Sequence, residues 1–207
     1  MTQLIIVEDS RVSREAFEQE LALLPDVELV ASIENAANAE LLCLNKKVDL
    51  VLMDVCTADD ESGLDAAARI KRSDPDIKII GMTSMPEHSF LEKAKAAGCD
   101  SFWYKETDSV SLGEICRRTL AGERVWPEGT PVVKIGLCRS DELTRRELDV
   151  IRLMAQGYRY EEITGILHIS INTVKYHVKN LLQKTGYRST VQLVAEVVEK
   201  RVVLPKY

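Results

Sequence analysis

Residues 170–186 read S-I-N-T-V-K-Y-H-V-K-N-L-L-Q-K-T-G, and this stretch predicts an amphipathic helix. Ser170 is a suitable N-cap, because its hydroxyl can accept a hydrogen bond from a free backbone N–H one turn into the helix. Gly186 is a suitable stop, since glycine adopts the left-handed conformation without a Cβ clash. Between these ends, apolar residues recur at helical spacing and form one face: Ile171, Val174, Val178 and Leu181.

The opposite face of this helix is polar, cationic and free of carboxylates. A face that serves only solubility usually mixes its charge signs, whereas lysines, amides and a tyrosine without acids suit the phosphates and base edges of DNA. A merely solvated face is the alternative. At about 100° per residue, the outward positions are Asn172, Tyr176, Lys179 and Gln183, with Lys175 and Asn180 on the flanks.

The residues before this helix predict a helix-turn-helix. Residues 143–157 form a helical pattern in which Thr144 and Glu147 make a capping box. Residues 160–168 predict a second short helix, and the I-S-I sequence that follows turns into the helix described above. Two helices joined by a short turn, the second one basic on its outer face, are typical of a DNA-binding motif.

A fourth helix is predicted at residues 189–201. Its apolar surface is broader than one buried face requires. Either all of these residues serve the core of a small helical domain, or part of the surface pairs with a second copy of the chain. The residues concerned are Val191, Leu193, Val194, Val197 and Val198.

The charge distribution divides the chain into two modules. Residues 143–207 hold 11 Lys/Arg and 6 Asp/Glu, a net charge of +5, whereas residues 1–142 hold 16 and 27, a net charge of −11. The overall charge of −6 therefore conceals a basic module and does not count against DNA as a partner. Apolar residues make up 45% of the chain and charged residues 29%, which is typical of a soluble globular protein.

Cysteine usage and the N-terminus favour a cytoplasmic protein without a membrane span. The five cysteines are scattered and form no C-x-x-C pair, which favours reduced thiols over a zinc site or a disulfide frame. The opening M-T-Q-L-I-I-V-E-D lacks the basic region of a signal peptide. No apolar run approaches the ~20 residues that span a bilayer.

The first module predicts five strands that alternate with five helices. Near-continuous apolar strands in this order are typical of a doubly wound parallel sheet with helices on both faces. Residues 1–122 therefore predict an α/β domain, residues 123–142 a linker with Trp126 and Val132-Val133 as anchors, and residues 143–207 a small all-α domain. The predicted strands are 4–7, 27–33, 48–55, 77–83 and 100–104. The first predicted helix follows strand 4–7 and ends at about residue 24, and the other four span 35–45, 63–73, 87–97 and 109–121.

Polar side chains follow the carboxyl ends of these strands, where open α/β sheets bind their ligands. Three carboxylates in one place repel each other unless a cation neutralises them, and an all-oxygen cluster prefers Mg²⁺. A carboxylate beside Mg²⁺ can act as a nucleophile toward a phosphoryl group. Taken singly, each residue has a simpler explanation as a helix cap or a solvated charge. The residues are Glu8, Asp9, Asp54, Thr83 and Lys105.

These residues and their strand-end positions resemble the receiver domain of response regulators over about residues 1–122. The resemblance implies that Asp54 is the phosphoacceptor. It also implies that Glu8, Asp9, Asp54 and the backbone carbonyl of Cys56 organise Mg²⁺. Thr83 and Lys105 match the switch hydroxyl and the lysine of the family, and Phe102 matches the aromatic residue whose rotamer follows the hydroxyl.

The loop after Asp54 departs from the family pattern. Receivers read D-x-x-M-P with a glycine eight residues after the aspartate, whereas D-V-C-T-A-D-D-E-S-G lacks the proline and places Gly63 nine residues on. The run from Asp59 to Glu61 adds negative charge that opposes a phosphoryl group. Cys56 beside the acceptor suggests a redox sensor as a minor alternative to a small apolar filler.

The second module resembles the LuxR-type output domain of NarL/FixJ response regulators over residues 143–200. The match is L-T-x-R-E…G…E-I…L-x-I-S-x-x-T-V-K-x-H-x-x-N…K-x-G, with a departure at Thr164-Gly165. The resemblance implies that the helix at 189–201 dimerises. It places Lys175, Tyr176 and Lys179 in the major groove, and Thr173 and Asn180 on phosphates. His177 lies on the border of the apolar face and is expected to pack or hydrogen-bond within the domain.

The sequence thus predicts a transcriptional response regulator rather than an enzyme. A sensor histidine kinase or a small phosphodonor would phosphorylate Asp54, and the receiver would then raise the affinity of a homodimer for double-stranded DNA. The homodimer would form through the receiver, the helix at 189–201, or both. One alternative is a pseudo-receiver that controls DNA binding without phosphorylation. Another is a Mg²⁺-dependent phosphohydrolase, which would leave the helix-turn-helix unexplained.

Overall fold

The computed structural model describes residues 1–58, 62–105 and 110–203. The acidic run from Asp59 to Glu61 lies outside these ranges. The chain divides into two compact units. The first unit holds residues 1–84 and 89–129, and the second holds residues 85–88 and 130–207. Each unit has its own core, so each is described by itself.

The first unit is built on the predicted five-stranded parallel sheet, with strand order β2-β1-β3-β4-β5. Because the strands alternate with helices and run parallel, their carboxyl ends meet at one edge. In the central pairs, Asp54 lies opposite Met82 and Thr83 lies opposite Tyr104. The strands are β1 (Thr2–Val7), β2 (Val27–Ile33), β3 (Leu50–Asp54), β4 (Lys78–Thr83) and β5 (Ser101–Tyr104).

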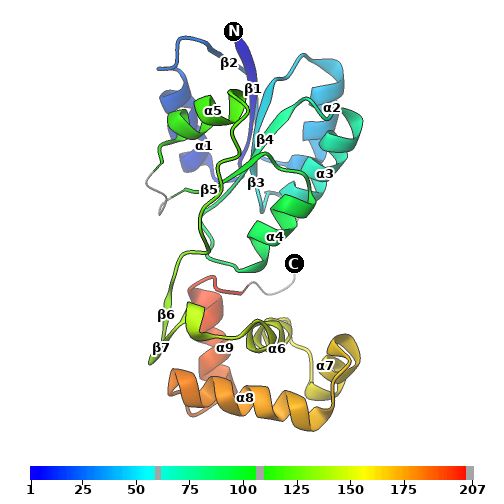
Figure 1. The fold of residues 1–207 in the computed structure, drawn as a ribbon, viewed down its shortest axis with the longest axis vertical. Helices are drawn as coiled ribbons and strands as arrows, with labels where there is room; N and C mark the ends of the chain where they lie inside the picture. The colour runs from blue at the N-terminus through cyan, green and yellow to red at the C-terminus, as the bar shows by residue number, and fades with distance from the viewer. Residues whose placement is uncertain (59–61, 106–109, 204–207) are drawn as a thin grey trace. The chain divides into compact units, whose positions relative to one another are not determined.

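Helices cover both faces of this sheet (Figure 1), as the sequence predicts. The helix expected at 35–45 begins instead as a 3₁₀ turn, η1 (Ala36–Asn38). Two side chains hold this turn, because Asn35 accepts from the N–H of Ala37 at 2.7 Å and Thr57 accepts from the N–H of Ala36 at 3.1 Å. The helices are α1 (Arg11–Leu21), α2 (Ala39–Asn45), α3 (Gly63–Ser73), α4 (Ser89–Ala96) and α5 (Leu112–Leu120).

One face of the sheet packs against α1 and α5, while α2, α3 and α4 lie on the other (Figure 1). Alternate residues of each strand point to opposite faces, so fully apolar strands are buried on both. The cluster under α1 and α5 contains Phe17, Trp103, Leu112, Ile115 and Cys116 together with side chains of β1, β3 and β4. This packing explains why the central strands are apolar at almost every position.

The first residues after α5 are attached to the outer edge of β5. The N–H of Phe102 donates to the carbonyl of Val125 at 2.9 Å. The indole of Trp126 stacks on the ring of Phe102 with the ring centroids 6.1 Å apart, and its N–H donates to the carbonyl of Asp100 at 3.1 Å. The prediction that Trp126 anchors this segment is confirmed. These contacts pair an edge strand that would otherwise be open.

The second unit contains a short hairpin that the sequence analysis did not foresee. Strands β6 (Lys134–Ile135) and β7 (Cys138–Arg139) pair antiparallel, and the 3₁₀ turn η3 (Ser140–Glu142) follows. Gly136 is required in the hairpin, because its φ is +55° and a Cβ there would lie 2.1 Å from the carbonyl oxygen of Thr185. The hairpin supplies Ile135 and Cys138 to the core of the helices.

The helices of this unit are α6 (Arg145–Ala155), α7 (Tyr160–Leu167), α8 (Ile171–Thr185) and α9 (Thr190–Glu199). The capping box of Thr144 and Glu147 is present, and Ser170 caps α8 through the N–H of Thr173. Gly186 ends α8 in the left-handed conformation with φ +76°. The predicted helix-turn-helix therefore corresponds to α7 and α8.

A partly buried ion pair joins α6 to the end of α8. The carboxylate of Glu147 accepts from the N–H and the hydroxyl of Thr144 and from Lys184 Nζ at 2.8 Å. Burial alone would raise the pKa of Glu147, but the bonds from Lys184 and Thr144 outweigh it and hold the pKa below its ordinary value of 4.5. The sequence indicated the cap, whereas the bond to Lys184 depends on the fold.

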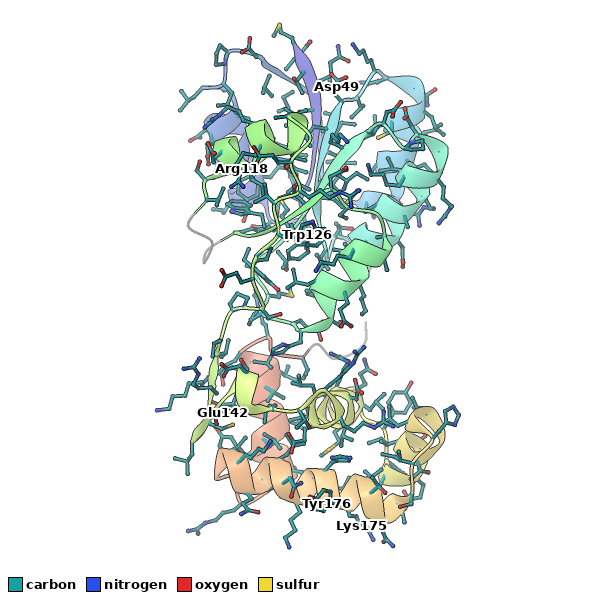
Figure 2. All side chains as sticks on the ribbon, in the orientation of Figure 1. Asp49, Arg118, Trp126, Glu142, Lys175 and Tyr176 are labelled. Carbon is teal, nitrogen blue, oxygen red and sulfur yellow. The ribbon has the colours of Figure 1, made fainter. Side chains whose placement is uncertain are left out.

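Replacing Glu147 with glutamine is expected to reduce the free energy of unfolding of this unit by about 2 kcal/mol at pH 7. The folded-state pKa is lowered, so the carboxylate's contribution is present above pH 4.5 and is lost as the pH falls through the folded value. Hydrogen exchange of α6 and α8 amides between pH 7 and pH 3 measures the difference. The exposed Glu142, labelled in Figure 2, provides the control Glu142→Gln. An equal loss at pH 3 would contradict the prediction.

Candidate functional site

Three carboxylates converge at the carboxyl ends of β1 and β3. One oxygen from each of Glu8, Asp9 and Asp54 lies within 4.8 Å of the other two. Glu8 and Asp54 are buried, at 1% and 6% exposure, and Asp9 is exposed. The strand-end argument therefore predicted correctly that these side chains meet. The result is an acidic cluster that is exposed to solvent at Asp9.

Lys105 closes this cluster from the end of β5. Its Nζ lies 3.0 Å from Asp54 Oδ2 and also donates to Glu8 Oε2. Burial raises the pKa of Asp54, Lys105 opposes that rise, and Glu8 adds to it, so the pKa reaches about 7 instead of 3.8. Burial works against the ammonium of Lys105, but Asp54 and Glu8 outweigh it and raise the pKa of Lys105. One ammonium is thus not enough to stabilise the charged form of Asp54.

The donor set fits a hard divalent cation. Three carboxylates and one ammonium have a formal charge of −2, and every side-chain donor is an oxygen. Mg²⁺ prefers such ligands, and a cation here would offset the burial and the repulsion from Glu8 that together raise the pKa of Asp54. The first unit therefore has an acidic cluster that could bind a metal.

Two contacts that the sequence analysis missed hold Glu8 in place. Arg14 Nη1 donates to the carbonyl oxygen of Glu8 at 2.6 Å. The N–H of Ser10 donates to Glu8 Oε1 at 3.2 Å. Arg14 lies six residues after Glu8, in the first turn of α1, and the direction in which α1 leaves the strand end places it on the Glu8 backbone. No local sequence signal identified it.

The altered loop after Asp54 is closed by a short bridge. Cys56 pairs antiparallel with Ser62, and the N–H of Gly63 donates to the carbonyl of Val55 at 3.0 Å. A Cβ at position 63 would lie 1.8 Å from the carbonyl oxygen of Asp54. The first residue of α3 therefore still packs directly on the backbone of Asp54, although Gly63 is one residue later than the family pattern.

Thr83 lies on β4, the strand next to that of Asp54, and Phe102 lies on β5, one strand further out. Thr83 is buried at the end of β4, and its carbonyl accepts from the N–H of Lys105 at 3.0 Å. Phe102 is buried against Trp126 and Tyr104, with the Phe102 and Tyr104 ring centroids 5.2 Å apart. A Cβ at Gly81 would lie 2.9 Å from the Phe102 ring. Thr83 thus lies at the carboxyl end of β4, whereas Phe102 lies opposite Gly81, two residues before the end of β5.

The predicted DNA-reading residues lie on α8. Lys175, Tyr176 and Lys179 are exposed, and Tyr176 is 61% exposed, which is high for an aromatic side chain. Figure 2 shows Lys175 and Tyr176 pointing outward from α8. The apolar face is formed by Val174, Val178 and Leu181, which are buried in the two helical clusters of this unit. The helix therefore presents its cationic face to solvent.

The two residues expected at phosphates are less exposed. Thr173 and Asn180 are both half-buried. The Thr173 hydroxyl lies 2.8 Å from the hydroxyl of its cap Ser170. His177 is also half-buried and its ring meets that of Tyr176 edge-on, with the ring centroids 5.8 Å apart, in agreement with its expected packing role.

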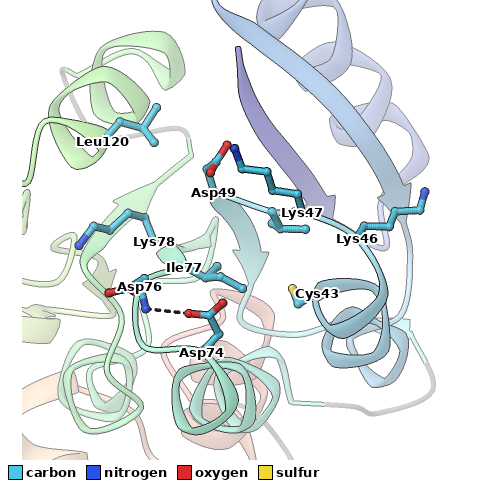
Figure 3. Close-up of a pocket in the computed structure, with 10 residues that line it drawn as sticks. Cys43, Lys46, Lys47, Asp49, Asp74, Asp76, Ile77, Lys78 and Leu120 are labelled. Atoms are coloured by element: carbon cyan, nitrogen blue, oxygen red, sulfur yellow. Dashed lines mark hydrogen bonds between the residues drawn. The ribbon is translucent and has the colours of Figure 1, made fainter.

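A pocket of about 420 Å³ lies at the opposite end of the first unit's sheet (Figure 3). It is lined by the beginnings of β3 and β4, including Asp49, Ile77 and Lys78, and by Lys47 and Asp74. Its lysines and aspartates mix both charge signs, and Asp74 Oδ1 already accepts a hydrogen bond from the N–H of Asp76 at 3.0 Å. This pocket has no convergent set of ligands and belongs to the amino ends of the strands.

Within the described part of the chain, no helix combines the length and apolar character that crossing a bilayer requires.

Comparison with known proteins identifies both units. Residues 4–117 match the response regulator receiver domain, and residues 141–197 match the bacterial regulatory proteins of the luxR family. The chain is 32% identical over 197 residues to the response regulator protein VraR of Staphylococcus aureus, covering 93% of this chain and 94% of the relative. VraR of Staphylococcus epidermidis has the same identity and coverage.

Solved structures share the fold. A structure of two RcsB dimers bound to two parallel DNAs matches with a TM-score of 0.64 and 21% identity over 95% of this chain and 97% of that one. A two-component response regulator of the LuxR family from Aurantimonas sp. matches with a TM-score of 0.56 and 26% identity over 60% of this chain and 89% of that one. With a receiver domain over more than half of its length and a luxR-family domain behind it, the chain belongs to the DNA-binding, LuxR-type response regulators.

Proposed function

We propose that this response regulator is a transcription factor whose affinity for double-stranded DNA is raised by Mg²⁺-dependent phosphorylation of Asp54. The observation that carries the proposal is the cluster at the sheet edge. Oxygens of Glu8, Asp9 and Asp54 lie within 4.8 Å of one another, and Lys105 Nζ lies 3.0 Å from Asp54. This arrangement combines a nucleophile, ligands for a cation and a fixed positive charge.

The reaction is a transfer of a phosphoryl group to an oxygen of Asp54. The carboxylate oxygen forms the new P–O bond, and the bond from phosphorus to the donor breaks, with its electron pair leaving on the donor. A sensor histidine kinase or a small acyl phosphate is the donor. Bound Mg²⁺ supplies charge neutralisation for the carboxylates and the transferred oxygens. Glu8, Asp9, Asp54 and the carbonyl of Cys56 are the proposed ligands.

The chain's own residues then respond to the new charge. A phosphoryl group adds about −1.5 to −2 charges, and Lys105 is placed to pair with one of its oxygens. The hydroxyl of Thr83 moves to donate a hydrogen bond to another of these oxygens. The ring of Phe102, on the neighbouring strand, follows the movement of Thr83. Because Phe102 stacks on Trp126, the movement reaches the first residues of the segment between the units.

DNA recognition is assigned to the exposed face of α8. Lys175, Tyr176 and Lys179 enter the major groove, and Thr173 and Asn180 lie toward phosphates. The regulator binds as a homodimer, supported by the exposure of Val191, which is 76% exposed on α9. Two half-sites about one helical turn, ~34 Å, apart would then be recognised.

Beryllofluoride with Mg²⁺ tests the proposal, because it mimics a phosphoryl group on the carboxylate. We expect the full-length chain to shift toward a dimer by size-exclusion chromatography. We also expect it to bind a duplex selected from a random pool more tightly. Chelation of Mg²⁺ should abolish both changes. DNA binding that is intact but insensitive to beryllofluoride and acetyl phosphate would support a pseudo-receiver instead, and multiple turnover of a phosphoester would indicate a hydrolase.

Substitution of the α8 lysines is expected to change the salt dependence of DNA binding. Each lysine on a phosphate contributes about 0.9 to the slope of log affinity against log salt concentration. Lys175→Ala and Lys179→Ala should each lower that slope by about this amount if the ammonium neutralises a phosphate. Lys134→Ala provides the control, since Lys134 is exposed on the hairpin strand β6 and not on α8. A lysine in the major groove contacts either a phosphate or a base edge. The assignment would be contradicted if both α8 variants kept the wild-type salt slope and also kept the wild-type preference for a selected duplex over a mixed-sequence duplex.

A further inference from the structure

One side chain of α6 reaches the end of the helix that precedes α8. Arg146 Nη2 donates to the carbonyl oxygen of Leu167, the last residue of α7, at 2.7 Å. The two residues are 21 positions apart in the sequence, so this is a tertiary contact. In the sequence, Arg146 is marked only by its place in the L-T-x-R-E motif.

The carbonyl of Leu167 requires a hydrogen-bond donor from outside α7. The last carbonyls of a helix have no partner within the helix. At the end of α7, the N–H groups of His168 and Ile169 both donate to the carbonyl of Thr164. A guanidinium at a helix C-terminus supplies a hydrogen bond and also meets the negative end of the helix dipole. Arg146 therefore acts as a cap delivered from another helix.

The turn that follows is held in an uncommon conformation. His168 has φ +53° and ψ +47°, and it is one of two non-glycine residues with positive φ in the described chain. Residues other than glycine rarely adopt this conformation. Only His168, Ile169 and Ser170 separate α7 from α8, so the backbone at this point sets the direction in which α8 leaves. We call these three residues the inter-helix turn.

Adjacent residues of α6 therefore hold both ends of the DNA-reading element. Arg146 binds the residue just before the inter-helix turn, and Glu147 binds Lys184 at 2.8 Å near the end of α8. A second contact of Arg146 lies within α6, where Nη1 is 3.6 Å from Asp149 Oδ2. Both terminal nitrogens of Arg146 are thus directed at partners within the protein.

We infer that Arg146 is a positioning residue for DNA recognition. It fixes the inter-helix turn, and through it the orientation of α8, without contributing its charge to a phosphate. A misoriented α8 still presents its lysines to the DNA backbone, but its base contacts no longer match the groove. Specific binding should therefore weaken more than non-specific binding, because phosphates carry no sequence information and base edges do.

The test compares Arg146→Met with the wild-type full-length chain. We would use a duplex selected from a random pool and a mixed-sequence duplex of the same length. The expected result is a loss of about tenfold in affinity for the selected duplex, the factor for one hydrogen bond to a charged group. We expect a smaller loss for the mixed duplex and an unchanged slope of log affinity against log salt. Hydrogen exchange at residues 167–170 should become faster while the α8 core amides stay protected.

Two further variants sharpen the comparison. Arg146→Lys keeps a donor of similar reach and should recover part of the specific affinity. Arg139→Met removes an exposed arginine of the same unit that pairs with Asp141. It should change neither the ratio of the affinities for the selected and mixed duplexes nor the salt slope. If Arg146→Met lowers the salt slope by about 0.9, Arg146 is a phosphate ligand and the inference is wrong. It is also wrong if the variant melts at lower temperature yet binds the selected duplex with unchanged affinity when folded.

Discussion

Replacing Asp54 with asparagine is expected to reduce labelling by acetyl phosphate and Mg²⁺ to background and to remove the response of DNA binding to beryllofluoride. The amide keeps the shape of the carboxylate but is not a nucleophile and is a poor ligand for a hard cation. Labelling with a radioactive phosphodonor, followed by gel electrophoresis at acidic pH to preserve the acyl phosphate, measures the first effect. Labelling that persists in the variant would show that another residue accepts the phosphoryl group.

The same substitution has a second, independent readout in stability. The folded-state pKa of Asp54 is raised from 3.8 to about 7, so the folded state binds this proton more tightly than the unfolded state. Stability therefore falls as the pH rises between these values. Without a divalent metal, Asp54→Asn should be more stable than the wild type at pH 7.5, and Mg²⁺ should stabilise only the wild type. Asp65→Asn, at an exposed acid of α3, is the control for both readouts.

Replacing Gly63 with alanine is expected to destabilise the receiver unit by about 3 kcal/mol, the upper part of the range for overpacking. The added Cβ would lie 1.8 Å from the carbonyl oxygen of Asp54 and 3.1 Å from the side chain of Met53. The obstacle is backbone, which cannot rotate away, so either α3 or the end of β3 must move. Urea unfolding followed by tryptophan fluorescence measures the change, because Trp103 and Trp126 both belong to this unit.

The substitution should also weaken metal binding, because a displaced Asp54 no longer meets Glu8 and Asp9. Gly113→Ala is the matched control in the same unit. Its Cβ would meet the side chain of Leu24 at 3.4 Å, an ordinary contact distance, so its stability should stay within about 1 kcal/mol of the wild type. If Gly63→Ala is as stable as Gly113→Ala, the loop of residues 56–62 adjusts more easily than the close packing on Asp54 suggests.

The secondary structure of both units could be predicted because it depends on local patterns. Residues 27–33 and 63–73 have the predicted bounds, since apolar runs and flanking polar residues define them. The helix at 35–45 was wrong in its first turn, because Thr57, more than a dozen residues later, supplies the hydrogen bond that favours a 3₁₀ conformation. The hairpin at 134–139 was missed because two-residue strands have no periodicity to detect.

The sequence by itself determined which residues meet at the sheet edge and which face of α8 carries the lysines. Parallel strands place their carboxyl ends together, and helical periodicity assigns each residue to a face, so both results follow from spacing alone. Only the tertiary structure decided what holds these residues in place. Arg14 on Glu8, Gly63 on the backbone of Asp54 and Arg146 on the end of α7 are contacts between separate elements. Their partners are set by how the elements pack, which no local pattern records.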